Sequence, residues 1–321
     1  MATVGFHASH EQHPPDHLLR CVVLAEEAGF QAAMCSDHFH PWSERQGESG
    51  FAWAWLGAAL QATGLPMGVV NAPGQRYHPA IVAQASATLA TMFPGRFWLA
   101  VGSGQNLNEH ITGDGWPVKD DRNARLLDSA AVIRDLWAGE TVTHRGHVTV
   151  EDAKLYTRPD TPPPLYGAAI TPETARWVAG WADGLITIAK PPDEMARVVD
   201  AFREGGGEGK PMILQVQLSY ARSEGAAEAA AVEQWGTNIL ESAVLAELRM
   251  PGDFEAAAEF VRTEDLEGPV RISSEPRQHV EWIRSDIEAG FSSILLHNVH
   301  PDQETFIGDF GEHVLPQLGE S

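Results

Sequence analysis

The sequence is poor in cysteine and lysine. Its 321 residues include two cysteines, Cys21 and Cys35, and only four lysines. Both cysteines lie in apolar segments and resemble small buried hydrophobic residues, so no disulfide framework is expected. Lys and Arg total 22 against 44 Asp and Glu, a formal charge of -22. Such a charge repels nucleic-acid phosphates and anionic lipid headgroups, which argues against partners of either kind.

Long hydrophobic runs are absent too. No segment is apolar over the roughly 18 residues that a bilayer-spanning helix needs. The first residues, MATVGFHASHEQHPP, lack the basic stretch and apolar stretch of a secretory signal. We therefore expect a cytoplasmic protein that does not contact membranes.

Apolar runs typical of strands alternate with helix-like segments along the whole chain, a pattern that predicts βαβ units around a parallel sheet. Eight strands are the number of a (β/α)8 TIM barrel. The sequence therefore predicts an α/β fold, with residues 1–321 forming one barrel domain. The expected strands are Val4–Ala8, Ala32–Ser36, Pro66–Val70, Phe97–Val101, Leu165–Ala169, Gly184–Ile188, Met212–Ser219 and Ser293–His297.

Two stretches interrupt the alternation. Residues 139–164 predict a short hairpin with a proline-rich exit, and residues 221–275 predict a larger, helical and acidic insertion between the seventh and eighth strands. In a barrel, such insertions usually cover the mouth. Helix ends are readable as well: Asp16 is expected to cap one helix, and Thr171-Pro172 to open another.

The segment SDHFHPW, residues 36–42, begins where the second predicted strand ends. The fourth predicted strand runs into GSGQNLNE and the fifth into GAAITPE, so these segments should meet at the carboxyl-terminal mouth of the barrel. In GSGQ and GAAITPE, small residues precede a helix start, an arrangement that favours an anion such as a cofactor phosphate. Small residues after barrel strands equally often serve tight turns.

His38 and His40 form an H-x-H pair, which can ligate a divalent ion in metal-dependent barrel hydrolases. The further ligands expected of such enzymes are absent, because the last strand ends in HNVHPD. A metal-dependent hydrolase is therefore the alternative, and no metal is expected. The histidines near the N-terminus, His7, His10, His13 and His17, are predicted to be solvated or to cap helices, since Pro14-Pro15 interrupts any shared helical face.

SDHFHPW, RYHPAIVAQASATLATMFPGRFWLAVGSGQNLNE and FSSILLHN together resemble the bacterial-luciferase-like superfamily of flavin-dependent oxidoreductases. The likeness is greatest to deazaflavin-dependent glucose-6-phosphate dehydrogenases and to a related branch thought to use FMN. The resemblance covers essentially the whole chain. It implies hydride transfer to or from a small organic substrate, with FMN as the expected cofactor and coenzyme F420 as the alternative.

The resemblance also implies roles for individual residues. His38 would accept a proton from a substrate hydroxyl, and Trp42 would shape the pocket; a histidine base suits alcohol oxidation. Val69-Val70 matches a family position with a cis peptide behind the cofactor ring. The residues that match cofactor-binding positions are Asp37, Val69, Val70, Gly104, Asn108, Ala168, Ala169 and Thr171.

Gln105 stands where the family dehydrogenases carry a glutamate assigned as an acid. Gln105 can form hydrogen bonds in the catalytic site but cannot donate a proton and regenerate. A flavin-binding protein without catalysis is therefore a second alternative. The family's basic phosphate pocket is only partly matched, by Lys190 and less clearly by Arg271 and Arg284. Lys190 is the candidate substrate-binding residue, and glucose 6-phosphate is not the first expected substrate.

The segment FAWAWLGAAL, residues 51–60, is unusually apolar for a solvent-facing helix. Related barrels pair through helices that flank the early strands. We therefore expect a homodimer; the alternative is that this helix is buried within one chain.

Overall fold

The computed structural model describes residues 2–319. Eight parallel strands close into a barrel in the order β9-β11-β1-β2-β3-β4-β7-β8, with β8 pairing again with β9. This confirms the predicted TIM barrel and all eight predicted strands. The barrel strands are β1 (Thr3–Ala8), β2 (Ala32–Cys35), β3 (Met67–Asn71), β4 (Phe97–Val101), β7 (Leu165–Ala168), β8 (Gly184–Ile188), β9 (Met212–Ser219) and β11 (Ser293–Asn298).

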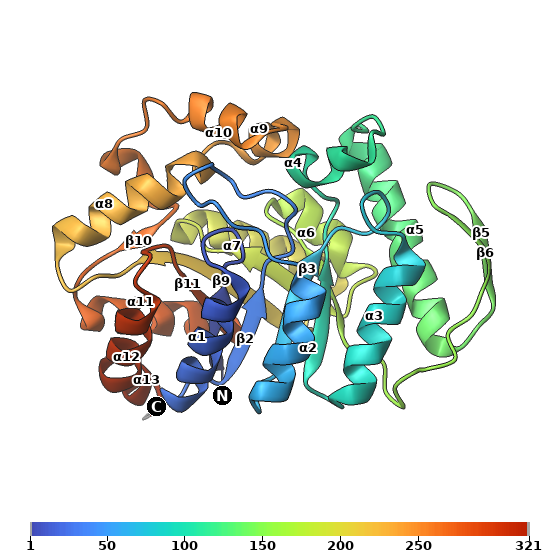
Figure 1. The fold of residues 1–321 in the computed structure, drawn as a ribbon, viewed down its shortest axis with the longest axis horizontal. Coiled ribbons are helices and arrows are strands. Elements are labelled where there is room, and N and C mark those ends of the chain that lie inside the picture. Colours follow the sequence, from blue (N-terminus) through green and yellow to red (C-terminus); the bar gives the residue numbers. More distant parts are fainter. Residues whose placement is uncertain (1, 320–321) are drawn as a thin grey trace.

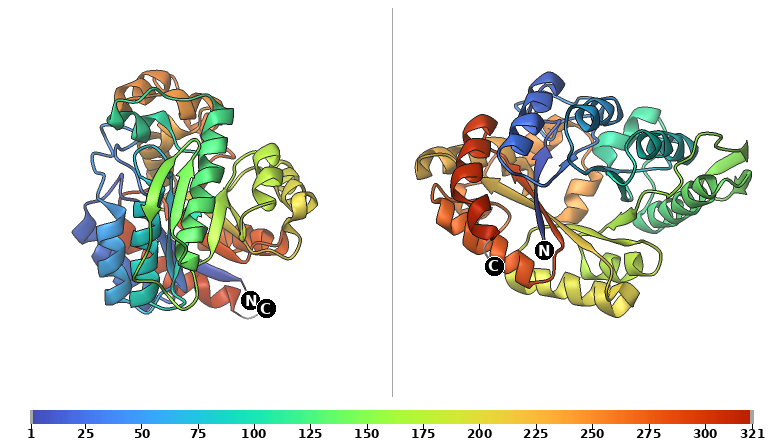
Figure 2. Two further views of the ribbon diagram at one scale, coloured as in Figure 1. Left: turned by 90° about the vertical axis from the view of Figure 1, so that its right-hand side faces the viewer. Right: turned by 90° about the horizontal axis from the view of Figure 1, so that it is seen from below.

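Helices surround these strands, as Figures 1 and 2 show. Those on the barrel wall are α1 (Pro15–Glu27), α2 (Ala52–Ala62), α3 (Pro79–Met92), α5 (Lys119–Ala138), α6 (Pro172–Ala179), α7 (Pro192–Phe202), α11 (Pro276–Glu288), α12 (Gln303–His313) and α13 (Leu315–Leu318). The short α4 (Asn106–Glu109) follows β4, and single turns cover His110–Thr112, Arg203–Gly207, Gly236–Asn238 and Thr263–Leu266.

Both predicted insertions are present. The hairpin consists of β5 (Val142–Arg145) and β6 (Thr149–Ala153) and projects from one side of the barrel (Figure 1). The larger insertion contains α8 (Glu224–Trp235), α9 (Ser242–Glu247), α10 (Pro251–Ala257) and the short strand β10 (Arg271–Ile272). In Figure 1 its helices lie above the carboxyl ends of the strands, opposite both chain termini. We call residues 221–270 the lid.

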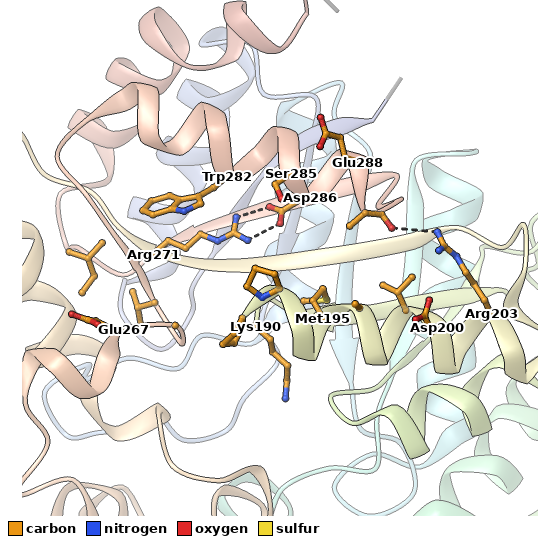
Figure 3. Close-up of a pocket in the computed structure, with 18 residues that line it drawn as sticks. Lys190, Met195, Asp200, Arg203, Glu267, Arg271, Trp282, Ser285, Asp286 and Glu288 are labelled. Carbon is orange, nitrogen blue, oxygen red and sulfur yellow. Dashed lines mark hydrogen bonds and ion pairs between the residues drawn. The ribbon is translucent and has the colours of Figure 1, made fainter.

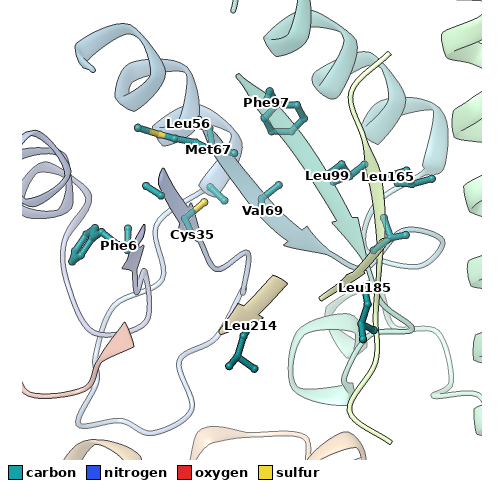
Figure 4. Close-up of a cluster of buried hydrophobic side chains, with 14 of the residues drawn as sticks. Phe6, Cys35, Leu56, Met67, Val69, Phe97, Leu99, Leu165, Leu185 and Leu214 are labelled. Carbon is teal, nitrogen blue, oxygen red and sulfur yellow. The ribbon is translucent and has the colours of Figure 1, made fainter. Parts of the chain in front are cut away.

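Strand alternation divides the core into an outer and an inner part. Outward side chains such as Val69, Leu99 and Leu165 are buried in the main cluster that joins the strands to the helices (Figure 4). Inward side chains fill the barrel floor, where the Trp98 ring lies against β3. A Cβ atom on Gly68 would lie 2.0 Å from that ring, so only glycine fits beside the indole.

Two local predictions are wrong. Pro14, rather than Asp16, is the N-cap residue of α1, because Pro15 already occupies the first helical turn; Asp16 pairs instead with Arg20 at 2.9 Å. No cis peptide bond occurs among the described residues, including Val69-Val70. β3 remains in regular register with β4 through this dipeptide, pairing Val70 with Ala100 and Asn71 with Val101.

Of the helices within residues 2–319, none combines the length and the apolar character needed to cross a bilayer.

Candidate active site

The mouth of the barrel contains a buried carboxylate next to His38. Glu11 follows β1, and its Oε1 lies 3.1 Å from Nδ1 of His38. Ser9 and Ser36 donate hydrogen bonds to the other oxygen of Glu11. A carboxylate that faces Nδ1 favours the tautomer with its proton on that atom. Nε2, on the opposite edge of the ring, is then the atom that can accept a proton.

The environment determines the charges of this pair. Burial lowers the pKa of His38, although Glu11 opposes this shift. Burial alone would raise the pKa of Glu11, but His38 and the hydrogen bond from Ser36 outweigh it, so that the pKa of Glu11 is lowered. At neutral pH Glu11 is therefore ionised and His38 neutral. A proton taken up by His38 would be stabilised by the adjacent carboxylate.

Trp42 connects His38 to the lid. Its ring meets the His38 ring edge to face at a centroid distance of 4.9 Å and meets Phe254 of α10 at 5.4 Å. A small hydrophobic cluster around Trp42 includes Leu107, Trp235 and Phe254. The lid thus packs directly on the residue that flanks the candidate base.

Asp37 lies in a buried polar network behind the mouth. Its carboxylate accepts hydrogen bonds from Asn71 at 2.6 Å and from Tyr77 at 3.0 Å. The Arg76 guanidinium lies 3.6 Å from Asp37 and 3.5 Å from Glu109, and so joins the ends of β2 and β4. Burial raises the pKa of Glu109, and Arg76 opposes this shift.

His40 and Asn108 shape the SDHFHPW loop. Oδ1 of Asn108 accepts hydrogen bonds from the backbone N–H groups of Phe39 and His40, at 2.8 and 3.2 Å. Nδ1 of His40 lies 2.9 Å from the carbonyl oxygen of Leu107. His38 and His40 therefore have separate partners, and within residues 2–319 no three His, Cys, Asp or Glu side chains come together as metal ligands.

Next to the SDHFHPW loop, on the side of the mouth formed by β3, β4 and β7, the inner surface is apolar. Strand register places Val70 beside Ala100, and Gly102 and Ala168 continue this inner surface; a Cβ atom on Gly102 would lie 3.4 Å from that of Ala168. These small side chains leave a smooth surface of the kind that a planar ring system needs. Val69, in contrast, is fully buried in the outer core, so only its backbone can face the mouth.

The two glycine- and alanine-rich loops differ in their ability to hold a phosphate. α6 is a full helix whose N-cap is Thr171, with the Thr171 hydroxyl accepting a hydrogen bond from Thr174. Ala169 lies just before this helix and is buried. α4, after GSGQ, spans a single turn and cannot supply a comparable dipole. Gly104 has a φ of 83° there, a conformation that requires glycine.

Gln105 is the half-buried N-cap residue of α4, and its side chain makes no capping hydrogen bond. Lys190 lies at the end of β8, with Nζ 3.5 Å from Glu194. Lys190 lines a cleft of about 620 Å³ between α7 and α11, outside β9, and in Figure 3 its side chain points away from Arg271. Arg271 is held by two hydrogen bonds to Asp286, at 2.6 and 2.7 Å.

The predicted solvation of the N-terminal histidines is wrong for three of the four. His7, His10 and His13 are buried, because β1 ends at the mouth and the following loop is covered by neighbouring loops and the lid. Glu11 is not among the site residues predicted from the sequence. The available signal was position: SHEQH follows β1 just as SDHFHPW follows β2.

Comparisons with known proteins identify the family of this chain. The family model described as luciferase-like monooxygenase matches residues 1–293. An F420-dependent glucose-6-phosphate dehydrogenase of Beutenbergia cavernae is 37% identical over 99% of this chain and 98% of its own length. The corresponding protein of Microbacterium testaceum is 34% identical over 98% and 96%.

Among solved structures, an F420-dependent secondary alcohol dehydrogenase in complex with an F420-acetone adduct is 31% identical and covers 99% of both chains, with a TM-score of 0.92. An F420-dependent tetrahydromethanopterin reductase from Methanopyrus kandleri, 21% identical with a TM-score of 0.80, shares the fold. The chain belongs to the luciferase-like family and is an oxidoreductase.

Proposed function

We propose that this protein uses coenzyme F420 to interconvert an uncharged secondary alcohol and its ketone at the barrel mouth. The observation that carries the proposal is the Glu11–His38 pair beside Trp42, at the edge of an apolar inner surface. The sequence alone favoured FMN over F420. The relatives, which are named as F420-dependent, support the reverse order.

The residues around the apolar surface suit a flat coenzyme. Val70, Ala100 and Ala168 present only small side chains inward, so a ring can lie against them without displacing protein atoms. The N-terminus of α6, with Ala169 and Thr171 at its start, is the better placed of the two loops for a coenzyme phosphate. Asp37 and Asn108 hold the loops that enclose this surface through hydrogen bonds, and Gly104 permits the turn after β4.

The protein's own contribution is proton transfer. When bound, the deazaflavin accepts or delivers the hydride. In alcohol oxidation Nε2 of His38 takes the hydroxyl proton, and Glu11 stabilises the resulting imidazolium. Trp42 holds the His38 ring and closes the site beneath the lid. Gln105 contributes hydrogen bonding only, since an amide has no proton to transfer and recover.

An uncharged substrate is proposed because cations near the strand ends already have carboxylate partners. Lys190 is paired with Glu194, and Arg271 with Asp286. Lys190 also lines the cleft outside β9 rather than the inner surface of the mouth.

We also propose that the protein is a homodimer. α2 exposes the small residues Ala54 and Ala58; Phe51, just before α2, is 58% exposed, and Ile81 of α3 is 56% exposed. This apolar surface would be covered by a second copy. Light scattering should give twice the monomer mass, and Ala58→Glu should return the protein to a monomer.

The proposed function is tested by titrating purified protein with F420 and with FMN, and then supplying cyclohexanol or glucose 6-phosphate. We expect F420 to bind more tightly than FMN, and cyclohexanol to bleach the visible absorbance of the oxidised coenzyme. Binding of FMN alone, or reduction by glucose 6-phosphate but not by cyclohexanol, would contradict the proposal. His38→Ala should bind the coenzyme and reduce it far more slowly than wild type.

A further inference from the structure

Three neighbouring strands place uncharged polar side chains on one side of the mouth. Register pairs His297 of β11 with Gln217 of β9, and Phe6 of β1 with Leu296. His7 and His297 are therefore neighbours on the inner face of the barrel, with ring centroids 4.5 Å apart. His7, His297 and Gln217 are 3%, 2% and 5% exposed. We call these three residues the histidine wall.

The hydrogen-bonding state of His297 follows from its partner. The Gln12 amide nitrogen donates to Gln234 and to the Val299 carbonyl, which leaves the Gln12 side-chain oxygen facing His297. Nε2 of His297 lies 2.7 Å from that oxygen and must donate to it. Nδ1 of His297 then carries a lone pair. It is buried and has no hydrogen-bond partner among the described residues.

His7 has the same deficiency, since its buried Nδ1 also has no partner within the described part of the chain. A buried polar atom without a partner destabilises the folded protein and calls for an explanation. Burial lowers the pKa of His7 to about 4 and that of His297 well below its usual value, so both rings are neutral at pH 7. Neutral imidazoles can accept a hydrogen bond from a hydroxyl group.

The histidine wall lies close to the catalytic pair. His7 precedes Glu11 by four residues, and the Glu11 carboxylate contacts His38. Both Glu11 and His38 influence the pKa of His7 electrostatically, Glu11 raising it and His38 lowering it. A substrate whose reacting hydroxyl meets His38 would thus bring its next polar group toward the histidine wall.

We infer that His7, His297 and Gln217 form a second substrate subsite that binds an additional hydroxyl group next to the carbon being oxidised. The substrate class is then an uncharged vicinal diol or polyol. The histidine wall carries no charge that could offset a buried phosphate or ammonium group. This inference rests on the proposed function, because it deepens the substrate preference of the same site.

The test compares cyclohexanol with a cyclic vicinal diol as substrates of the F420-loaded enzyme. We expect the wild type to favour the diol in kcat/KM by about tenfold or more, the effect of one satisfied hydrogen bond. His297→Phe should lower kcat/KM for the diol about tenfold and change that for cyclohexanol by less than about twofold. If His7→Phe does not fold, His7→Gln can replace it. Because His7→Gln keeps a polar group, its loss of kcat/KM for the diol should be smaller.

His279→Phe is the matched control. His279 is 1% exposed and contacts the Ser273 carbonyl outside the barrel, so its loss should leave the ratio of the two substrates unchanged. An equal loss with both substrates in His297→Phe, or no preference for the diol in the wild type, would overturn the subsite.

Diol binding measured by saturation-transfer NMR separates the two proposals. Should F420 fail to bind or cyclohexanol fail to react, the proposed function fails, and diol binding still reports on the histidine wall. Weaker diol binding to His297→Phe than to wild type, with His279→Phe unchanged, supports the subsite. Equal diol binding to all three proteins overturns it.

Discussion

The two sides of the barrel mouth differ in chemistry. β9, β11 and β1 contribute Gln217, His297 and His7, whereas β3, β4 and β7 contribute Val70, Ala100 and Ala168. Strand β2, which carries the SDHFHPW loop, lies between β1 and β3 in the sheet order. His38 therefore stands at the boundary between a polar and an apolar surface.

This arrangement suggests why proton and hydride transfer can occur side by side. The apolar side can support a planar coenzyme without competing hydrogen bonds, and the polar side can orient a hydroxylated substrate. A base at the boundary reaches a substrate that touches both. If the two sides have separate roles, substitutions on the apolar side alter coenzyme binding and those on the polar side alter substrate selection. Identical effects from both sides would contradict this division.

The largest expected effect is a loss of turnover on substitution of His38, which lies at the boundary between the two surfaces. His38→Ala should lower kcat by roughly a hundredfold to ten-thousandfold, the range for losing a general base. Coenzyme affinity should change little, because the residues of the apolar side are untouched. Single-turnover reduction of bound F420 measures the step directly.

His40→Ala is the matched control, since His40 contacts the Leu107 carbonyl and shapes the loop. It should cost stability or substrate affinity and leave kcat within a few-fold. Equal losses in both variants would remove His38 from its role as base.

The second-largest expected effect is a pH dependence of stability caused by His7 on the polar side. The pKa of His7 is about 4 in the folded protein, against a usual value of 6.5. As pH falls below 6.5 the unfolded chain binds a proton that folded His7 does not, so stability is lost progressively down to about pH 4 and levels off below it. At about pH 5 this loss amounts to about 2 kcal/mol for His7.

Urea unfolding at about pH 7.5 and about pH 5 measures the loss. In His7→Phe the drop in unfolding free energy between these conditions should be smaller by about 2 kcal/mol than in wild type. An identical drop in both proteins would show that His7 is not held neutral by burial.

The sequence predicted much of this architecture and less of its chemistry. Alternating apolar runs located all eight strands, and the segments after β2, β4 and β7 were correctly predicted to follow strands at one mouth. Glu11 and His7 were missed because a histidine-rich N-terminus looks solvent-exposed in isolation. Only the closure of β11 onto β1, almost 300 residues apart in the chain, buries them.

Local signals also failed where tertiary contacts or neighbouring prolines dominated. Asp16 has a capping side chain but follows Pro15, which starts the helix. The short α4 could not be distinguished from a longer helix by the GSGQ motif alone. Lys190 matched a family position, yet its pairing with Glu194 became visible only in the structure.

A smaller effect is expected on the apolar side. Ala168→Leu adds three carbon atoms where the coenzyme ring is proposed to lie, and overpacking of this kind costs about 1–3 kcal/mol. Affinity for F420 should fall about tenfold or more, as measured by fluorescence titration. Ala229→Leu, an exposed site on α8, should leave affinity unchanged. Unaltered coenzyme binding in Ala168→Leu would place the ring elsewhere.

The smallest effect is predicted for Lys190→Ala. Lys190 lies at the end of β8, next to the polar side, but its ammonium group is 3.5 Å from Glu194 and is partly neutralised. For an uncharged diol, kcat/KM should change by less than about twofold, in keeping with the small energies of exposed ion pairs. Glucose 6-phosphate provides the contrasting substrate. If the polar side instead served phosphorylated sugars, Lys190→Ala would raise KM for glucose 6-phosphate strongly and leave the diol unaffected, and the assignment of an uncharged substrate would have to be given up.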